Sequence, residues 1–175
     1  YSVKVQKYRD GAPYQQPRQL AGADVIFEKD YRIKLSVNSP QSGYFYVLNG
    51  PPRRINEVPR YIILLAEPAG GEDPVPLNTE FPEDTWLKFD DREGTEKLWL
   101  VWSARRIPAL EAVRGLDNPR DEGRITDPGQ AGAVKGFLEK SLERKPVTER
   151  DEENKQTTIK GGGDTLVYPL ELKHM

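Results

Sequence analysis

The chain has 175 residues, 36% hydrophobic and 31% charged, which is typical of one globular domain that buries roughly 70% of its unfolded surface. Its 26 basic and 28 acidic residues nearly cancel, giving a formal net charge of −2, so neither nucleic acid nor an anionic membrane is favoured as a partner. The absence of cysteine excludes disulfides, thiolate metal ligands and cysteine nucleophiles, and no apolar run approaches the roughly 20 residues that cross a bilayer.

The 15 glycines and 15 prolines indicate many turns and favour a β-rich fold. In YSVKVQKY, residues 1–8, apolar and polar side chains alternate, which predicts a half-exposed strand at a sheet edge. The start at Tyr1, without an initiator methionine or a signal-like segment, leads us to expect a piece of a larger protein.

Residues 31–49 predict an antiparallel hairpin. Its first strand, YRIKLSVN, places apolar side chains on one face and polar ones on the other. A turn at 38–43 contains Pro40 and Gly43, and the second strand, YFYVL at 44–48, is apolar on both faces. A strand without a polar face predicts an interior position, covered above and below.

Further strands are expected at YIILL (61–65), TWLKFD (85–90) and KLWLVWS (97–103), with the proline-rich residues 66–84 as a loop. Period 2 places Trp99 and Trp102 on opposite faces of the last of these strands.

Two helices follow. Pro108 and Gly115 bracket a short one, and a longer one is predicted at 128–143, where Asp127 can cap the N-terminus and Pro128 suits the first turn. Its apolar residues recur at helical spacing: Val134, Phe137, Leu138 and Leu142. This stripe predicts that the helix covers an outer face of the sheet.

The remaining chain is interpreted as a charged, solvated linker at 144–156 and a hairpin at 157–173 that turns at Gly161–Gly163. Because Pro169 lacks a backbone donor, the last strand is expected at an edge or at a bulge.

The expected fold is therefore mainly β: an antiparallel β-sandwich, Ig-like or related, of about seven to eight strands with one amphipathic helix packed on it. We expect a single domain, 1–175, with a core at 24–112, the helix and charged linker at 113–156, and the C-terminal β-hairpin at 157–173.

No catalytic motif is evident. The one histidine, His174, stands next to the C-terminus, and Gly161–Gly163 lacks the Lys-Ser/Thr of a phosphate-binding loop. Asp90, Asp91 and Glu93 offer oxygen ligands for calcium, yet the spacing does not match an EF-hand, and a hydrated turn is the simpler interpretation. A glycosidase built on two carboxyls stays open, because the sequence cannot place carboxyls in space. No cofactor is implied.

The aromatic residues allow two interpretations. Tyr44, Tyr46, Trp86, Trp99 and Trp102 stand in apolar strands, where core packing is the ordinary role. Alternatively, flat rings bind sugars or proline-rich peptides, and Trp86, Tyr44 and Tyr46 are then the candidate ligand-binding residues.

Residues 24–112 resemble the bacterial domain of unknown function 4384 family. The resemblance begins with DVIFEKDYRIKLSVNSPQSGYFYVLNG and continues through FPEDTWLKFD and EGTEKLWLVWSARRIPALE. The matching positions are Gly43, Tyr44, Tyr46, Pro82, Phe89, Gly94, Glu96 and Ser103.

The resemblance implies a non-catalytic accessory module of a larger bacterial signalling or envelope protein, often linked to eukaryotic-like serine/threonine kinases. We accordingly expect no enzyme activity, a sensing or regulatory role, and a place outside the cytoplasm. The expected partners are a protein or glycan ligand, or other domains of the parent chain, with no nucleic acid and no membrane insertion. A carbohydrate- or peptide-binding module with exposed aromatics is the alternative.

Overall fold

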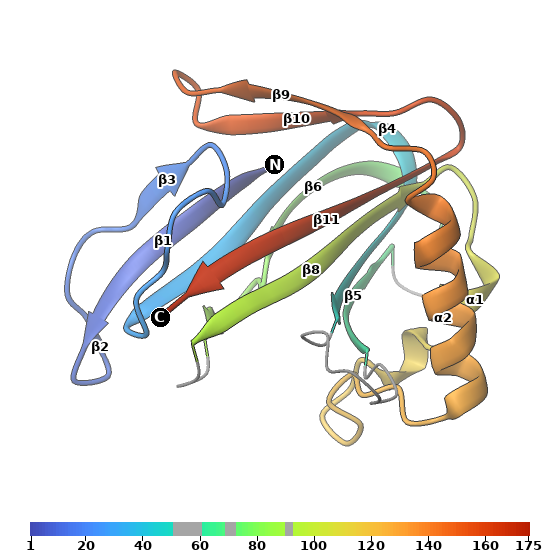
Figure 1. Ribbon diagram of the computed structural model, residues 1–175, viewed down its shortest axis with the longest axis horizontal. Helices are drawn as coiled ribbons and strands as arrows, with labels where there is room; N and C mark the ends of the chain where they lie inside the picture. The colour runs from blue at the N-terminus through green and yellow to red at the C-terminus, as the bar shows by residue number, and fades with distance from the viewer. Residues whose placement is uncertain (51–60, 69–72, 90–92) are drawn as a thin grey trace.

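A computed structural model describes the chain except residues 51–60, 69–72 and 90–92 (Figure 1). The fold is mainly β, with a large antiparallel sheet and two α-helices. The strands are β1 (Ser2–Arg9), β2 (Ala12–Pro13), β3 (Arg18–Leu20), β4 (Tyr31–Gly50), β5 (Ile62–Glu67), β6 (Val75–Phe81), β7 (Leu87–Lys88), β8 (Gly94–Ser103), β9 (Val147–Asp151), β10 (Gln156–Lys160) and β11 (Thr165–His174). The helices are α1 (Pro108–Glu111), the 3-10 turn η1 (Arg114–Leu116) and α2 (Pro128–Ser141).

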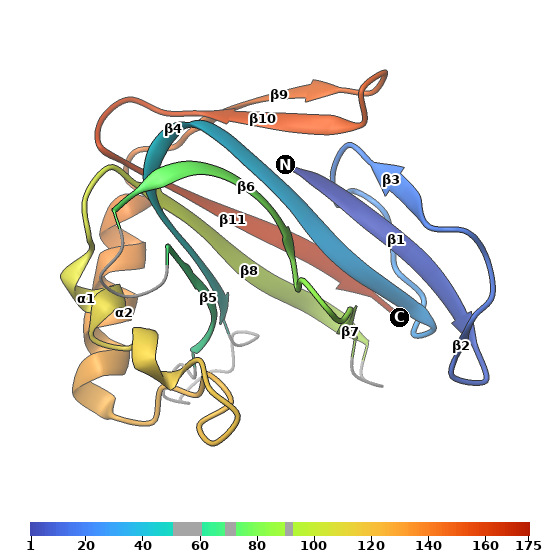
Figure 2. The same ribbon diagram turned by 180° about the vertical axis from the view of Figure 1, so that it is seen from behind.

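The central element is β4, a strand of 20 residues that bends near its middle. Its first half pairs with β1 and with β6 and β7, and its second half pairs with β8 and β5. Strand β11 adds to β8 at the edge. Seen from both sides, β8 and β11 lie over β1, β6 and the first half of β4, and β4 passes from one layer to the other at its bend (Figures 1 and 2).

The predicted hairpin at 31–49 is therefore wrong, because its two strands are halves of one strand. The Ser-Pro-Gln-Ser segment forms an irregularity in the pairing with β6, between Ser39 and Ser42, and does not reverse the chain. Pro40 stands in this irregularity, where the ladder requires no backbone donor from it.

Two hydrophobic clusters occupy the two faces of the β4–β8 sheet. The first lies between the layers and contains Phe45 and Val47 of β4 together with Val3, Ile33, Leu35, Leu98, Leu100 and Leu170. The second lies beneath the helices and contains Tyr46, Leu48, Trp99, Val101, Leu110, Val134 and Leu138. The stretch 44–48 is thus covered on both faces, as its lack of a polar side predicted.

Helix α2 provides the expected cover. Asp127 caps it by accepting a hydrogen bond of 2.8 Å from the backbone nitrogen of Gln130, and Pro128 opens the first turn. Val134 and Leu138 have no exposed surface, and burying each such side chain is worth roughly 1.5–3 kcal/mol. The helix ends at Ser141, two residues before the predicted end.

For the C-terminal residues, the prediction of which strands pair with one another was wrong. Residues 147–151 form β9 instead of a linker, and β10 pairs with β9 while β11 pairs with β8. The expected hairpin around Gly161–Gly163 does not form, because β11 is apolar enough to pair along its whole length with the equally apolar β8. As expected, β11 with Pro169 lies at the sheet edge.

Two further expectations were wrong. Strand β1 lies inside the sheet, between β4 and the short strands β2 and β3, where an edge position was expected. The proline-rich residues 66–84, expected as a loop, contain β6. In the described part of the chain β6 pairs with β4 on one side only. Its proline, which has no backbone N–H, therefore removes few hydrogen bonds between strands.

Close contact between β4 and β8 requires a glycine at position 43. A Cβ atom there would lie 2.5 Å from Trp102 Nε1 and 2.8 Å from the carbonyl oxygen of Ser103. We expect Gly43→Ala to lower the free energy of unfolding by about 1–3 kcal/mol, measured by urea denaturation, because the indole or the strand must shift.

The matched control is Gly132→Ala on the exposed side of α2, where a Cβ meets no atom within 4 Å. This change should raise the free energy of unfolding by roughly 0.5–1 kcal/mol, since alanine favours a helix over glycine. Unchanged stability of Gly43→Ala would contradict the contact.

Candidate functional site

A groove of about 550 Å³ opens where β4 bends, beneath the β9–β10 hairpin. Its volume falls within the roughly 300–1,000 Å³ of small-molecule and cofactor sites. The lining residues come from β4, β6, β8, β10, the segment after β10, β11 and the residue before β1. Figures 1 and 2 show the hairpin lying across the upper end of the two layers.

The floor of the groove is apolar. Phe45 of β4, Leu100 and Trp102 of β8 and Leu166 of β11 form most of it. Trp102 is half-buried, and its indole nitrogen, packed against Gly43, has no hydrogen-bond partner among the described residues. This floor suits an apolar side chain or a flat ring.

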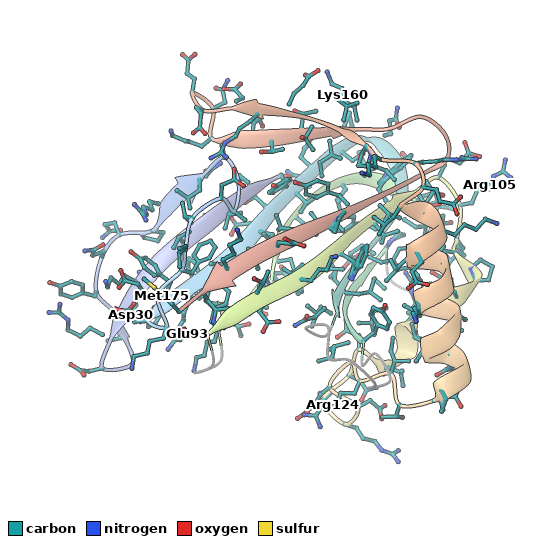
Figure 3. The ribbon with its side chains drawn as sticks, in the orientation of Figure 1. Asp30, Glu93, Arg105, Arg124, Lys160 and Met175 are labelled. Carbon is teal, nitrogen blue, oxygen red and sulfur yellow. The ribbon has the colours of Figure 1, made fainter. Side chains whose placement is uncertain are left out.

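The rim of the groove is polar. It carries Asn38, Ser39 and Gln41 of β4 on one side and Thr158 of β10 on the other. The charged groups among the described lining residues are the N-terminal ammonium of Tyr1, which donates to the carbonyl oxygen of Thr157, and the side chain of Lys160. Its Nζ lies 2.6 Å from a carboxylate oxygen of Glu149, in an exposed ion pair; Figure 3 shows it at the outer edge of β10.

The groove exists because one edge of β4 lacks a partner at the bend. Strand β1 pairs with β4 as far as Ser36, and β8 begins to pair at Tyr44. Between these two residues, the described pairings of β4 are with β6. A strand has two edges, so the opposite edge of this segment is open to the groove.

Hydrogen bonds and an ion pair hold the hairpin over the groove. The backbone nitrogens of Tyr1 and Thr157 each donate to the other's carbonyl oxygen at 2.7 Å. The buried Thr157 hydroxyl donates to the carbonyl oxygen of Ala21 at 2.5 Å. Arg150 of β9 adds an ion pair with Asp24. The hairpin is therefore anchored to the body of the protein along one side.

The structure does not bring the three predicted ligand-binding residues together. Tyr46 has no exposed surface and lies in the cluster beneath the helices. Tyr44 packs against the same cluster, and the Cζ atom of Arg106 lies 4.8 Å from the centroid of its ring. Trp86 is half-buried in another region, beside Lys34 of the first half of β4, whose Nζ lies 5.5 Å from the indole centroid. The groove instead uses Trp102, which the sequence offered only as one of several aromatics.

The buried Tyr46 belongs to a polar network that fixes α1. Its hydroxyl donates to Glu111 at 2.6 Å, and Arg106 Nη1 donates to the other carboxylate oxygen at 2.8 Å. Burial raises the pKa of Glu111, but these hydrogen bonds and the charges of Arg114 and Arg106 outweigh it and leave that pKa below its ordinary value. Burial and the bond to Glu111 raise the pKa of Tyr46.

Of the proposed calcium ligands, Asp90 and Asp91 lie outside the described residues. Across the described chain, with its gaps at 51–60, 69–72 and 90–92, no group of His, Cys, Asp and Glu side chains is arranged to hold a metal ion. His174 is buried, with its ring stacked on that of Phe89 at a centroid distance of 4.9 Å and its Nε2 3.8 Å from Glu96.

No family model, curated protein or solved structure matches this chain. None of the helices in the described residues is both long enough and apolar enough to cross a membrane.

The network around Glu111 predicts a pH-dependent contribution to stability. Because the folded state lowers this pKa, the ionised carboxylate stabilises the fold above its ordinary value of about 4.5, and that stabilisation is lost as the pH falls through the folded-state pKa. We expect Glu111→Gln to reduce the free energy of unfolding by about 1.5–3 kcal/mol at pH 7, and by much less at pH 3.

Urea denaturation at both pH values measures this difference. The control is Glu139→Gln, whose exposed carboxylate pairs with Lys135 at 3.8 Å and should change stability by less than about 0.5 kcal/mol. An equal deficit for Glu111→Gln at pH 7 and pH 3 would show that the ionised carboxylate is not the cause.

Proposed function

We propose that this chain is a non-catalytic binding module of the β-sandwich type, and that the groove between β4 and β10 is its ligand site. The observation that carries the proposal is the open edge of β4 above an apolar floor that contains Trp102. A cavity with an apolar floor and a few polar groups at its rim is suited to binding a small ligand or a short peptide.

The proposed biological setting is an accessory domain of a larger bacterial signalling or envelope protein, outside the cytoplasm. The resemblance of residues 24–112 to the domain of unknown function 4384 family supports this setting. In such a protein the groove would report the presence of a protein or glycan ligand to the domains joined to it.

The second candidate is a carbohydrate- or peptide-binding module that uses an exposed aromatic. Trp86 is the residue that favours it, since its indole is half-buried and lies over no described core cluster. The two candidates differ in which tryptophan the ligand touches.

Intrinsic tryptophan fluorescence separates them. N-acetylglucosamine oligomers, proline-rich peptides and short extended peptides are titrated against the natural chain, Trp102→Phe and Trp86→Phe. We expect a ligand-induced change that persists in Trp86→Phe and disappears in Trp102→Phe, because Trp102 forms part of the groove floor.

The reverse pattern would transfer the site to Trp86 and support the second candidate. No change with any of these probes would refute a binding role for the groove. Catalytic turnover of a probe, abolished by one substitution in the groove, would refute the non-catalytic assignment.

A further inference from the structure

The outer face of the sheet formed by β1, the first half of β4, β6 and β7 carries a cluster of positive charges. Ile33 and Leu35 of β4 belong to the core between the layers, so Arg32 and Lys34 project from the opposite face. Lys88 of β7 pairs with Arg32 and therefore projects from the same face. Figure 2 views the sheet from this side, with β1 and β6 in front of β8 and β11.

Like charges lie directly opposite each other twice on this face. Lys4 of β1 pairs with Lys34. Arg32 of β4 pairs with Lys88 of β7. Side chains in such positions are roughly 5 Å apart at Cβ, so like charges repel each other. Glu80 compensates part of this repulsion, because the hydrogen bond from Lys4 and the charge of Lys34 hold the pKa of Glu80 below its ordinary value.

The guanidinium of Arg32 is held in place without the use of its hydrogen-bond donors. Its Cζ atom lies over the ring of Tyr8, 3.6 Å from the ring centroid. Within the described chain, no hydrogen bond or ion pair engages the N–H groups of Arg32 or the ammonium of Lys88. A guanidinium presents its donors as a fork that fits a carboxylate at two points. Arg32 is therefore pre-positioned for a carboxylate, and Lys88 beside it supplies a second positive charge.

Trp86 adds a flat apolar surface next to these two cations. Continuing the register of the Arg32–Lys88 pair by two residues along both strands places Trp86 opposite Lys34. The Nζ atom of Lys34 lies 5.5 Å from the indole centroid and donates to the carbonyl oxygen of Glu83 at 2.5 Å. Two residues of a strand span about 6.8 Å, so a ligand held by Arg32 and Lys88 reaches the half-buried indole.

We infer that this face is a second ligand site, separate from the groove, and that it binds an acidic glycan. Arg32 and Lys88 hold the carboxylate of a uronic acid, and the apolar side of a sugar ring packs against Trp86. None of these three residues belongs to the described lining of the groove, so the failure of either site leaves the other standing.

The acidic residues around the cations favour a ligand with widely spaced negative charges. Glu83 and Asp84 are exposed just before Trp86, and Glu80 lies beside Lys4. A nucleic acid carries a charge on every nucleotide and would bring neighbouring phosphates against these carboxylates. An anionic membrane would do the same, and its recognition takes a cluster of about four to eight Lys or Arg residues. A glycan whose carboxylates are separated by neutral sugars avoids this repulsion.

The test uses the whole chain and isothermal calorimetry with a hyaluronan tetrasaccharide, in which glucuronate alternates with N-acetylglucosamine. The methyl ester of the same tetrasaccharide keeps every sugar ring but carries no charge. We expect the acid to bind and the ester to bind at least about tenfold more weakly, because a neutral ester forms no charge-assisted hydrogen bond with Arg32.

Three variants that each remove one positive charge test the protein side. Arg32→Gln and Lys88→Gln remove it from the proposed site, and Lys88 is exposed, so its replacement leaves the core intact. Arg105→Gln is the matched control, because Arg105 is exposed on another part of the molecule (Figure 3). We expect at least about a fivefold loss of affinity in the first two variants and less than a twofold change in Arg105→Gln.

Equal affinity for the acid and the ester would overturn the recognition of a carboxylate. Unchanged affinity in both Arg32→Gln and Lys88→Gln would overturn the location of the site. Binding that is lost in Trp102→Phe and kept in Trp86→Phe would assign the glycan to the groove and overturn the second site.

No heat with the tetrasaccharide would overturn the glycan ligand. If a thymidine oligonucleotide or phosphatidylserine vesicles then bind, and bind more weakly to Lys88→Gln, the face recognises a different polyanion and the inference is wrong. If urea denaturation shows that Arg32→Gln does not fold, the comparison of Lys88→Gln with Arg105→Gln decides.

Discussion

The rest of the structure depends on one constraint, which is that a single strand, β4, belongs to both layers. Its first half is held by β1 and β6, and its second half by β8 and β5. Such a strand has to bend between the layers, and β6 follows it through the bend, from Leu35 to Gly43. On its other edge, β1 pairs as far as Ser36 and β8 begins to pair at Tyr44. In the described chain no strand pairs with this edge between those two residues, and the groove lies beside it.

The second half of β4 is fixed at both ends by a glycine that faces a tryptophan. Gly43 lies against the indole of Trp102, and Gly50 against that of Trp99, where an added Cβ would come within 2.7 Å of the indole nitrogen. Both indole nitrogens are buried without a hydrogen-bond partner among the described residues. Leaving such a donor unpaired costs about 1–3 kcal/mol, which the buried surface of each ring offsets.

The contacts between these glycines and tryptophans link the stability of the fold to the shape of the groove. The two tryptophans lie on opposite faces of β8, as period 2 predicted, so that Trp99 packs beneath the helices and Trp102 faces the groove. The same strand that closes the core therefore provides the apolar floor of the groove. A rigid floor on a central strand is better suited to selective binding than one formed by a loop.

Much of the fold could be predicted where the signal was local. The apolar run at 44–48 predicted an interior strand, Asp127 and Pro128 predicted the start of α2, and Pro169 predicted an edge. The bend of β4 could not be predicted, because Ser39–Ser42 is compatible with either a reversal or a bulge, and distant pairing with β6 decides between them. Strand β9 was missed because most of it is exposed, so it carries no apolar period.

The groove could not be predicted either, because it also depends on which distant strands pair. It joins Asn38, Trp102 and Ile159, which lie in separate strands far apart in the sequence, and the open edge is a property of strand order and not of any motif. The candidates chosen from sequence, Trp86, Tyr44 and Tyr46, were chosen for residue type. Residue type alone does not distinguish an aromatic under a helix from one at the floor of a cavity.

Amide hydrogen exchange along β4 in the free protein tests the central claim most directly. If one edge is open at the bend, the amide of Asn38 should exchange at least about tenfold faster than those of Leu35 and Val37, which face β6. An Asn38 amide as protected as that of Val37 would contradict the account, because the edge of β4 that borders the groove would then be closed.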